Sequence, residues 1–194
     1  GITIDSGNYQ AALERALEVA EYPHWRAEQA SSRVRDDGKL LGVGVATTAT
    51  GSGGSGGVGA RSSFARVTID GDGHVTVDSD VSPHGQGMNT SFAQLVADQL
   101  GFVPEDITLQ TGDTDKTTPY GPGTGTYASR SLVIGGSAAH DAAKEARVLL
   151  EAVAAQALEC DPATVRIEQG RGFSTTSPSR TMSVGELATL AQRD

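Results

Sequence analysis

The stretch SPHGQGMNTSFAQLVADQLG, residues 82–101, places a glutamine between two glycines and then begins a helical pattern at once. Its apolar residues recur at the spacing of one helix face: Phe92, Leu95, Val96 and Leu100. Gly101 follows as a stop signal, because glycine readily adopts the left-handed conformation that ends many helices. The stretch therefore predicts a helix over 88–100 with a glycine loop at its N-terminus.

That loop has a composition suited to a ligand. Gly85 and Gly87 permit positive φ angles and a close approach of the backbone, while the first turn of a helix leaves N–H groups without partners. Such a place holds anions. Gln86 carries both a donor and an acceptor, so it suits a phosphate oxygen or a heteroaromatic edge. The alternative interpretation is a plain turn with a glycine on each side of a polar residue.

Strand patterns lie on both sides of this helix. FARVTIDGDGHVTVDSD, residues 64–80, predicts two strands joined by a tight glycine turn, and DITLQTGD, residues 106–113, predicts a third. Helical patterns cover 8–22 and 131–159. These elements predict an α+β fold, in which helices at 8–22, 88–100 and 131–159 cover a small mixed sheet containing a β-hairpin.

The outer parts of the chain follow the same periodicities. In residues 131–159 the expected buried face is a set of small and aliphatic residues: Ala139, Ala142, Ala143, Ala146, Leu149, Leu150 and Val153. Pro23 should end or kink the first helix. The tail from Thr164 predicts a strand, then a polar loop, then a short helix capped by Ser183 with Glu186 three residues later.

Composition excludes several classes of function. The formal net charge of −9 and the scattered basic residues argue against nucleic acid as a partner. The single cysteine, Cys160, leaves no disulfide framework and no paired-cysteine metal site, which fits a cytoplasmic protein. No apolar run is long enough for a membrane span, and no signal peptide is visible. We expect Cys160 to be a semi-buried small apolar residue.

A glycine- and serine-rich segment, TGSGGSGGVGARSS, contains a formal dinucleotide-binding motif at Gly51, Gly53 and Gly56. That motif requires a following helix N-terminus, and a strand pattern follows here. We therefore interpret residues 50–62 as a mobile loop.

A second glycine segment, PYGPGTGTYASRSLVIGG at residues 119–136, also runs into a helical pattern. Hydroxyl groups and one guanidinium gather there: Thr124, Thr126, Ser129, Arg130 and Ser131. These groups suit phosphate recognition. Helix capping by the serines and a solvated surface charge for Arg130 remain open as alternatives.

Five motifs, taken in order, carry a resemblance to a known family: GVGVATTATGSG, ARVTIDGDGHVTV, HGQGMNTSFAQLVADQLG, PEDITLQTGDTD and PYGPGTGTYASRS. Together they resemble the molybdenum-cofactor-binding large subunit of the xanthine dehydrogenase, aldehyde oxidase and carbon monoxide dehydrogenase family. The resemblance implies that the chain binds molybdopterin with molybdenum, with its cytosine dinucleotide form left open. The implied cofactor-binding residues are Gly85, Gln86, Gly87, Thr126, Tyr127, Ala128, Ser129, Arg130 and Ser131.

The same resemblance implies the reaction and the partners. Enzymes of this family hydroxylate an aldehyde, an N-heterocycle or a purine, or oxidise carbon monoxide, with oxygen from water. Electrons leave through [2Fe-2S] clusters to FAD, which we expect on partner subunits or domains. The metal is held by the cofactor's dithiolene, so no protein metal ligand is expected.

The sequence also departs from the family pattern. The family's catalytic glutamate lies in a GVGE motif near the C-terminus of the subunit, and the nearest match here, SVGEL at 183–187, is better explained as a capping box. The aromatic–glutamate pair of many relatives is missing near Thr50, and His84 has no carboxylate neighbour that would make it a proton carrier. We therefore expect residues 1–194 to be one fragment of a molybdopterin-binding domain, inactive alone and completed by the remainder of the large subunit. The alternative is a non-catalytic module that binds a phosphate-bearing ligand or a partner subunit.

Overall fold

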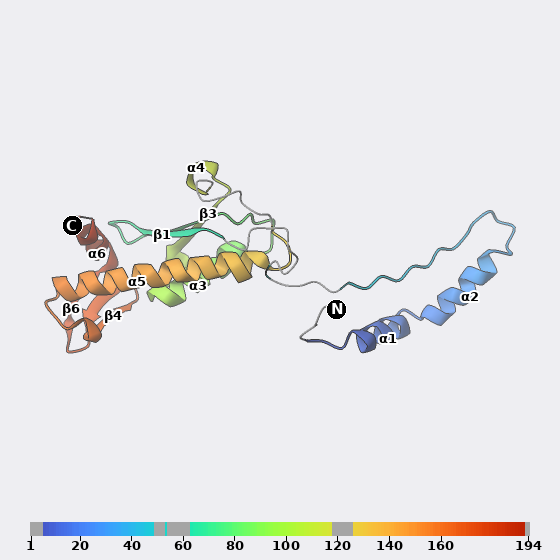
Figure 1. Cartoon of the computed structure of the whole chain (residues 1–194), viewed down its shortest axis with the longest axis horizontal. Coiled ribbons are helices and arrows are strands. Elements are labelled where there is room, and N and C mark those ends of the chain that lie inside the picture. The colour runs from blue at the N-terminus through green and yellow to red at the C-terminus, as the bar shows by residue number, and fades with distance from the viewer. Residues whose placement is uncertain (1–5, 49–52, 54–62, 118–125, 193–194) are drawn as a thin grey trace. The chain divides into compact units, whose positions relative to one another are not determined.

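The computed structural model describes residues 6–48, 53, 63–117 and 126–192 (Figure 1). The chain divides into two compact units, Gly1–Thr50 and Gly51–Asp194. The prediction of a single domain stays a prediction. Apart from Gly53, the loop predicted at 50–62 lies outside the described residues.

The first unit contains two helices, α1 (Tyr9–Val19) and α2 (Tyr22–Ser32). The Asn8 side chain caps α1 by accepting a hydrogen bond from the Ala11 N–H at 3.0 Å. The helix predicted over 8–22 ends earlier, because Glu21 takes a left-handed conformation with φ of 49°. Pro23 then lies in the first turn of α2, where its missing N–H costs nothing. No side chain of α1 is buried, and its predicted place over the sheet stays a prediction.

The second unit begins with a mixed sheet of β1 (Ala65–Ile69), β2 (Val75–Ser79) and β3 (Ile107–Thr111), in that order. β1 and β2 form the predicted antiparallel hairpin, and β3 runs parallel to β2. The hairpin turn is closed by the Asp70 carboxylate, which accepts a hydrogen bond from the His74 N–H at 2.9 Å. The mixed sheet with a hairpin is therefore confirmed.

Helix α3 (Met88–Leu100) connects β2 to β3 through a 3₁₀ turn at Pro104–Asp106. The long helix α5 (Ser137–Ala157) is the dominant feature of this unit (Figure 1). Its alanines pack with α3 and the sheet in one core, whose members include Val75, Val77, Phe92, Val96, Leu100, Ala139 and Ala143. Gly101 ends α3 as predicted, with φ of 74°, and a Cβ there would lie 2.3 Å from the Ile167 carbonyl oxygen.

A second sheet was not predicted. It contains β4 (Val165–Glu168), β5 (Arg171–Ser174) and β6 (Ser177–Ser183), all antiparallel, preceded by a 3₁₀ turn at Pro162–Thr164. The prediction of a polar loop after β4 was wrong, because β5 and β6 pair their backbones although β6 has mostly exposed side chains. Helix α6 (Val184–Ala191) follows β6, and a separate core forms from residues that include Leu150, Ala154, Val165, Ile167, Val184 and Leu187.

The remaining helical segments differ in detail from the predicted pattern. Residues Ser131–Gly136 form a π-helical turn before α5, and α4 is a single turn at Thr114–Thr117. Most of the predicted buried face of α5 is covered, but Leu149 is 67% exposed. Among the described residues, no helix has the length and apolar character needed to cross a membrane.

Candidate functional site

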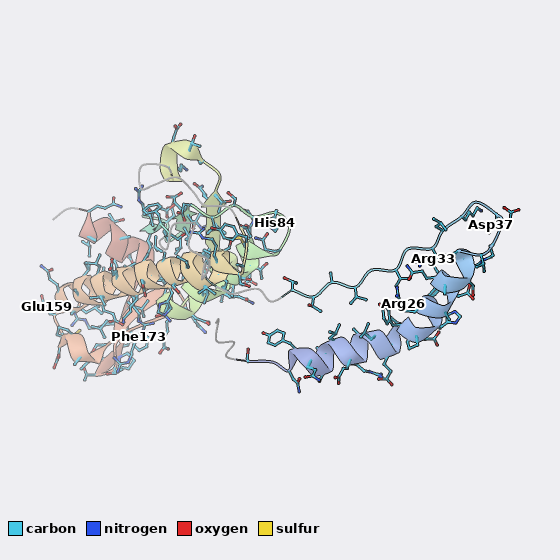
Figure 2. All side chains as sticks on the ribbon, turned by 45° about the vertical axis from the view of Figure 1, so that its right-hand side comes forward. Arg26, Arg33, Asp37, His84, Glu159 and Phe173 are labelled. Carbon is cyan, nitrogen blue, oxygen red and sulfur yellow. The ribbon has the colours of Figure 1, made fainter. Side chains whose placement is uncertain are left out.

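The loop before α3 contains two glycines with positive φ and open space beside them. Gly85 and Gly87 have φ of 103° and 76°, and a Cβ built at either position would meet no atom within 4 Å. Gly87 is the N-cap of α3, and no side chain caps this helix. The N–H groups of its first turn therefore donate no hydrogen bond to a capping side chain. Figure 2 labels His84, which lies on the exposed loop ahead of α3.

Gln86 is bonded within its own loop. Its Oε1 accepts a hydrogen bond from the His84 N–H at 2.7 Å, and its Nε2 donates to the Met88 sulfur at 3.0 Å. The orientation of the amide follows from the first contact, because a backbone N–H requires an acceptor. Gln86 is exposed, whereas Met88 is buried. Gln86 therefore also shapes the turn, as the alternative interpretation expected.

The second predicted segment lies against this loop. The Thr126 hydroxyl donates to the Ser82 carbonyl oxygen at 2.6 Å and lies 2.8 Å from the Ser131 hydroxyl. These contacts bring Ser82, Thr126 and Ser131 together, although more than 40 residues separate Ser82 from Thr126. The periodicity of the sequence alone gave no such pairing.

The backbone of this segment is held in an uncommon conformation. Ala128 and Ser129 have φ of 48° and 56°, although neither is a glycine. The Ala128 carbonyl accepts a hydrogen bond from the Gly53 N–H at 2.9 Å, and the Ser129 carbonyl accepts one from Val133. Non-glycine residues with positive φ are uncommon and cluster at ligand sites.

The side chains of this segment divide into buried and exposed groups. Arg130 is 1% exposed and Ser131 is 5% exposed, whereas Tyr127 is 45% exposed and Ser129 is also exposed. The interpretation of Arg130 as a solvated surface charge was therefore wrong. Burial of a guanidinium is uncommon unless it is paired. Arg130 therefore lies inside the fold and not on its surface.

Two glycines that were not predicted as site residues let the segment approach the rest of the fold. In the π-helical turn, a Cβ at Gly135 would lie 2.4 Å from Val81, and one at Gly136 would lie 3.2 Å from Leu95. The available signal was the adjacent pair of glycines inside a helical pattern. Single-turn π-helices are rare and occur often at functional sites.

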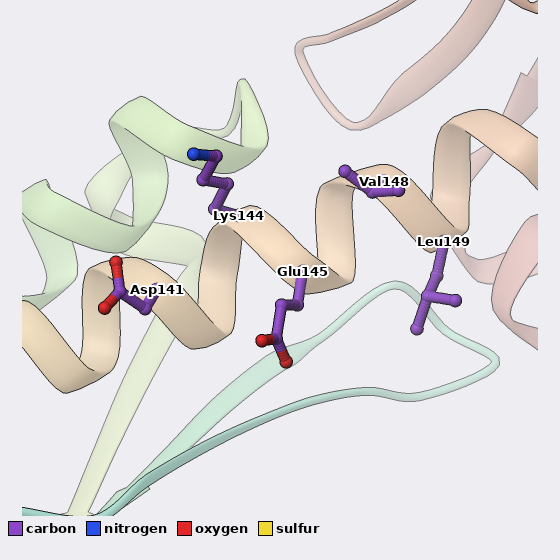
Figure 3. Close-up of a pocket in the computed structure, with 5 residues that line it drawn as sticks. All are labelled: Asp141, Lys144, Glu145, Val148 and Leu149. Carbon is purple, nitrogen blue, oxygen red and sulfur yellow. The ribbon is translucent and has the colours of Figure 1, made fainter.

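The other features of the second unit that were considered as sites are a hollow along α5, metal-ligand groups and Cys160. A hollow lies along α5 beside Asp141, Lys144, Glu145, Val148 and Leu149, and none of these is a predicted cofactor residue (Figure 3). No group of histidine, cysteine, aspartate and glutamate side chains that would suit a metal ion occurs in the described parts of the chain. Cys160 is partly buried, as predicted.

The SVGEL segment forms the predicted capping box. The Ser183 N–H and hydroxyl donate to Glu186 at 2.7 Å and 2.8 Å, and the Glu186 N–H donates back to the Ser183 hydroxyl at 3.2 Å. The hydrogen bond from the Ser183 backbone, followed by that from its side chain, lowers the pKa of Glu186. A carboxylate engaged in this way stabilises a helix end and is a poor base.

Comparison with known proteins agrees with these motifs. Residues 15–194 match the family described as molybdopterin cofactor-binding domain. The chain belongs to this family. It is 37% identical over 166 residues to the carbon monoxide dehydrogenase large chain of Hydrogenophaga pseudoflava, covering 82% of this chain and 20% of that protein. It is 32% identical over 195 residues to the nicotine 6-hydroxylase large subunit of Paenarthrobacter nicotinovorans, covering 97% of this chain and 23% of that protein.

A solved structure shares the fold. Quinoline 2-oxidoreductase from Pseudomonas putida 86 is 33% identical, with a TM-score of 0.61, over 97% of this chain and 24% of that one. The α+β class is therefore confirmed, as is the resemblance to large subunits of molybdenum hydroxylases. The chain spans about a fifth to a quarter of the length of the relatives that it matches.

Proposed function

We propose that this domain forms one wall of a molybdopterin site, built from residues 85–87 and 126–131. The observation that carries the proposal is the hydrogen bond from Thr126 to the Ser82 carbonyl, which unites the two glycine segments. This hydrogen bond supports placing the nine residues implied by the family resemblance in one site. Neither segment alone offers both an open backbone and several polar groups.

The residues present fit the chemistry of this cofactor. The uncapped first turn of α3 carries a partial positive charge, which suits a phosphate group. The space at Gly85 and Gly87 admits a ligand close to the backbone. Gln86, Ser129 and Tyr127 add neutral polar groups on exposed side chains. No acidic side chain belongs to the proposed contact set, so the set does not repel an anionic ligand.

In this proposal the chain binds and orients the cofactor and moves no proton. The bound cofactor would supply molybdenum through its own dithiolene, for hydroxylation of a substrate with oxygen from water. The substrate class stays open among aldehydes, N-heterocycles, purines and carbon monoxide. Partners in the proposal are the remainder of a large subunit and the subunits or domains that hold [2Fe-2S] clusters and FAD.

Substitutions of Gln86 test the proposal in a large subunit that carries this sequence. Gln86→Ala removes a polar contact to a bound anion and should weaken cofactor binding by about 1–3 kcal/mol. Gln86→Glu should reduce occupancy further, because a carboxylate would face phosphate oxygens. Activity per bound molybdenum should change far less than molybdenum content.

Gln94→Ala provides a matched control, since Gln94 is exposed on the same helix. Elemental analysis of molybdenum and fluorescence of released pterin are the measurements. Equal cofactor content in all variants would reduce Gln86 to a turn residue and contradict the proposal. A chain that binds phosphate compounds but no pterin would favour the non-catalytic module.

The purified chain should behave differently from the complete subunit. It covers 24% of the quinoline 2-oxidoreductase chain, so we expect it to supply only one side of the site. The prediction is a folded chain without stoichiometric molybdenum. Stoichiometric metal in the purified chain would contradict the expectation that a second part of the subunit is required.

A further inference from the structure

A chain of hydroxyl groups joins the two segments of the site, and its direction follows from the number of protons available. A carbonyl oxygen only accepts, so the 2.6 Å contact requires Thr126 to donate its single hydroxyl proton to Ser82. The Thr126 oxygen lies 2.8 Å from the Ser131 oxygen. Because the Thr126 proton is already used, the Ser131 hydroxyl must be the donor in this second contact.

This direction removes both hydroxyls as donors to an anion. The Ser131 proton points to Thr126, and the Thr126 proton points to the loop before α3. Ser131 is also 5% exposed, so little of its surface is open to a ligand. A phosphate group needs donors, since its own oxygens are acceptors at neutral pH. Thr126 and Ser131 therefore fit a structural link between two segments better than direct contact with a phosphate.

Other groups of the site keep their donors. The Gln86 Oε1 accepts a hydrogen bond from the His84 N–H. The Gln86 Nε2 carries two N–H bonds, and its described contact is to the Met88 sulfur, a weak acceptor. The Ser129 hydroxyl is exposed on the strained turn that follows Tyr127. Both can donate to a ligand acceptor. The Gln86 Nε2 can therefore donate to an oxygen or to an unprotonated ring nitrogen of a ligand.

We propose that Thr126 and Ser131 are positioning residues that form a hydroxyl clamp, while Gln86 Nε2 and Ser129 donate to the ligand. The clamp links Ser82, just ahead of the loop at 84–87, to Ser131 at the start of the π-helical turn. This assignment rests on the proposed function for the identity of the ligand. The clamp itself is a property of the chain without ligand.

Hydrogen exchange on the 194-residue chain tests the clamp directly. Thr126→Val keeps the side-chain shape and removes the hydroxyl, so the amides of residues 84–88 should exchange roughly threefold to tenfold faster. Ser131→Ala should act in the same direction. Thr126→Ser should restore slow exchange. Thr108→Val, an exposed position on β3, is the matched control and should leave these amides unchanged.

Cofactor content separates clamp residues from ligand contacts. In a large subunit carrying this sequence, Thr126→Val should lower pterin content and speed exchange together. Ser129→Ala should lower pterin content and leave exchange at 84–88 as in the unchanged protein.

Each outcome has a distinct meaning. Unchanged exchange in Thr126→Val would overturn the clamp. Faster exchange in Thr126→Val, together with normal pterin content in Thr126→Val, Ser129→Ala and Gln86→Ala, would uphold the clamp and refute the proposed function. Faster exchange in Ser129→Ala would overturn the division of roles, since it would make Ser129 a structural residue as well.

Discussion

Two helices of the second unit, α3 and α6, begin at glycine-containing turns but satisfy their first N–H groups differently. α6 starts with Ser183, whose side chain accepts from Glu186 while Glu186 reaches back. α3 starts at Gly87 with no side-chain cap. The N-terminus of α6 is capped by its own side chains, whereas the first N–H groups of α3 have no side-chain cap.

The glycines at the two helix starts also differ in the space beside them. A Cβ at Gly185 would lie 2.3 Å from the Gly71 carbonyl oxygen and 2.8 Å from the Gly73 nitrogen. At Gly85 and Gly87 a Cβ would meet nothing. Glycine in α6 serves close packing inside the protein, whereas glycine before α3 leaves room beside the backbone. The SVGEL segment at the start of α6 therefore has a structural role, and the HGQG segment before α3 has the open backbone that the proposed ligand site requires.

The largest expected effect is on the packed glycine. Gly185→Ala forces a methyl group against backbone atoms that have little freedom to move, so we expect a loss of stability of about 3 kcal/mol or more. Gly85→Ala meets no atoms and should cost only about 1–2 kcal/mol for its positive φ. Urea unfolding of both variants measures the difference. Equal losses would contradict the contrast between the two turns.

Removing the cap of α6 should have a smaller effect. Ser183→Ala leaves the Glu186 N–H without its acceptor, which should reduce the free energy of unfolding by about 1 kcal/mol. Asn89→Ala, an exposed change in the first turn of α3, is the control and should stay within about 0.5 kcal/mol. A large loss from Asn89→Ala would show that α3 also depends on a side chain for its N-terminus.

Closing the open terminus should separate stability from binding. Thr90 is exposed in the first turn of α3, and Thr90→Glu places a negative charge near unpaired N–H groups. We expect the helix to gain about 0.3–1 kcal/mol while a large subunit carrying the change loses molybdenum, because the carboxylate competes with an anionic ligand. Thr90→Gln should change both quantities little. Normal molybdenum content in Thr90→Glu would place the ligand elsewhere.

The smallest expected effect is the pH dependence of the capping box. The Ser183 hydrogen bonds hold the pKa of Glu186 below its usual 4.5, so the charged form is favoured in the folded state. Its contribution to stability is present above 4.5 and is lost as the pH falls through the lowered pKa. The difference in Tm between the unchanged chain and Glu186→Gln should therefore shrink from neutral pH to about pH 3. A constant difference would contradict this assignment.

Local signals in the sequence were sufficient for the elements whose partners lie nearby. The hairpin at 64–80, the end of α3 at Gly101 and the capping box at Ser183 each depend on contacts within a few residues. They were predicted correctly because turn and cap geometry is set by local backbone preferences. The composition of β5 and β6 lacked an apolar alternation, so backbone pairing in the second sheet gave no such signal.

The candidate site shows the same division. The glycines and hydroxyls at 85–87 and 126–131 were predicted as cofactor contacts from the family motifs, but which of them are buried or bonded within the chain was not predicted. Burial of Arg130 and the bond between Thr126 and Ser82 depend on how α3, the π-helical turn and the sheet pack together. Exposure of Leu149 likewise follows from which side of α5 meets the core.

The sequence by itself determined the helix and hairpin periods, the open glycine turn before α3 and membership of the molybdopterin cofactor-binding domain family, because each depends on residue type and spacing along the chain. Only the tertiary structure decided which polar groups remain free to bind. A hydroxyl has one proton to donate, and its destination depends on neighbours far away in the sequence. Packing brought Ser82, Thr126 and Ser131 within hydrogen-bonding distance, and it left the Gln86 amide and the Ser129 hydroxyl exposed.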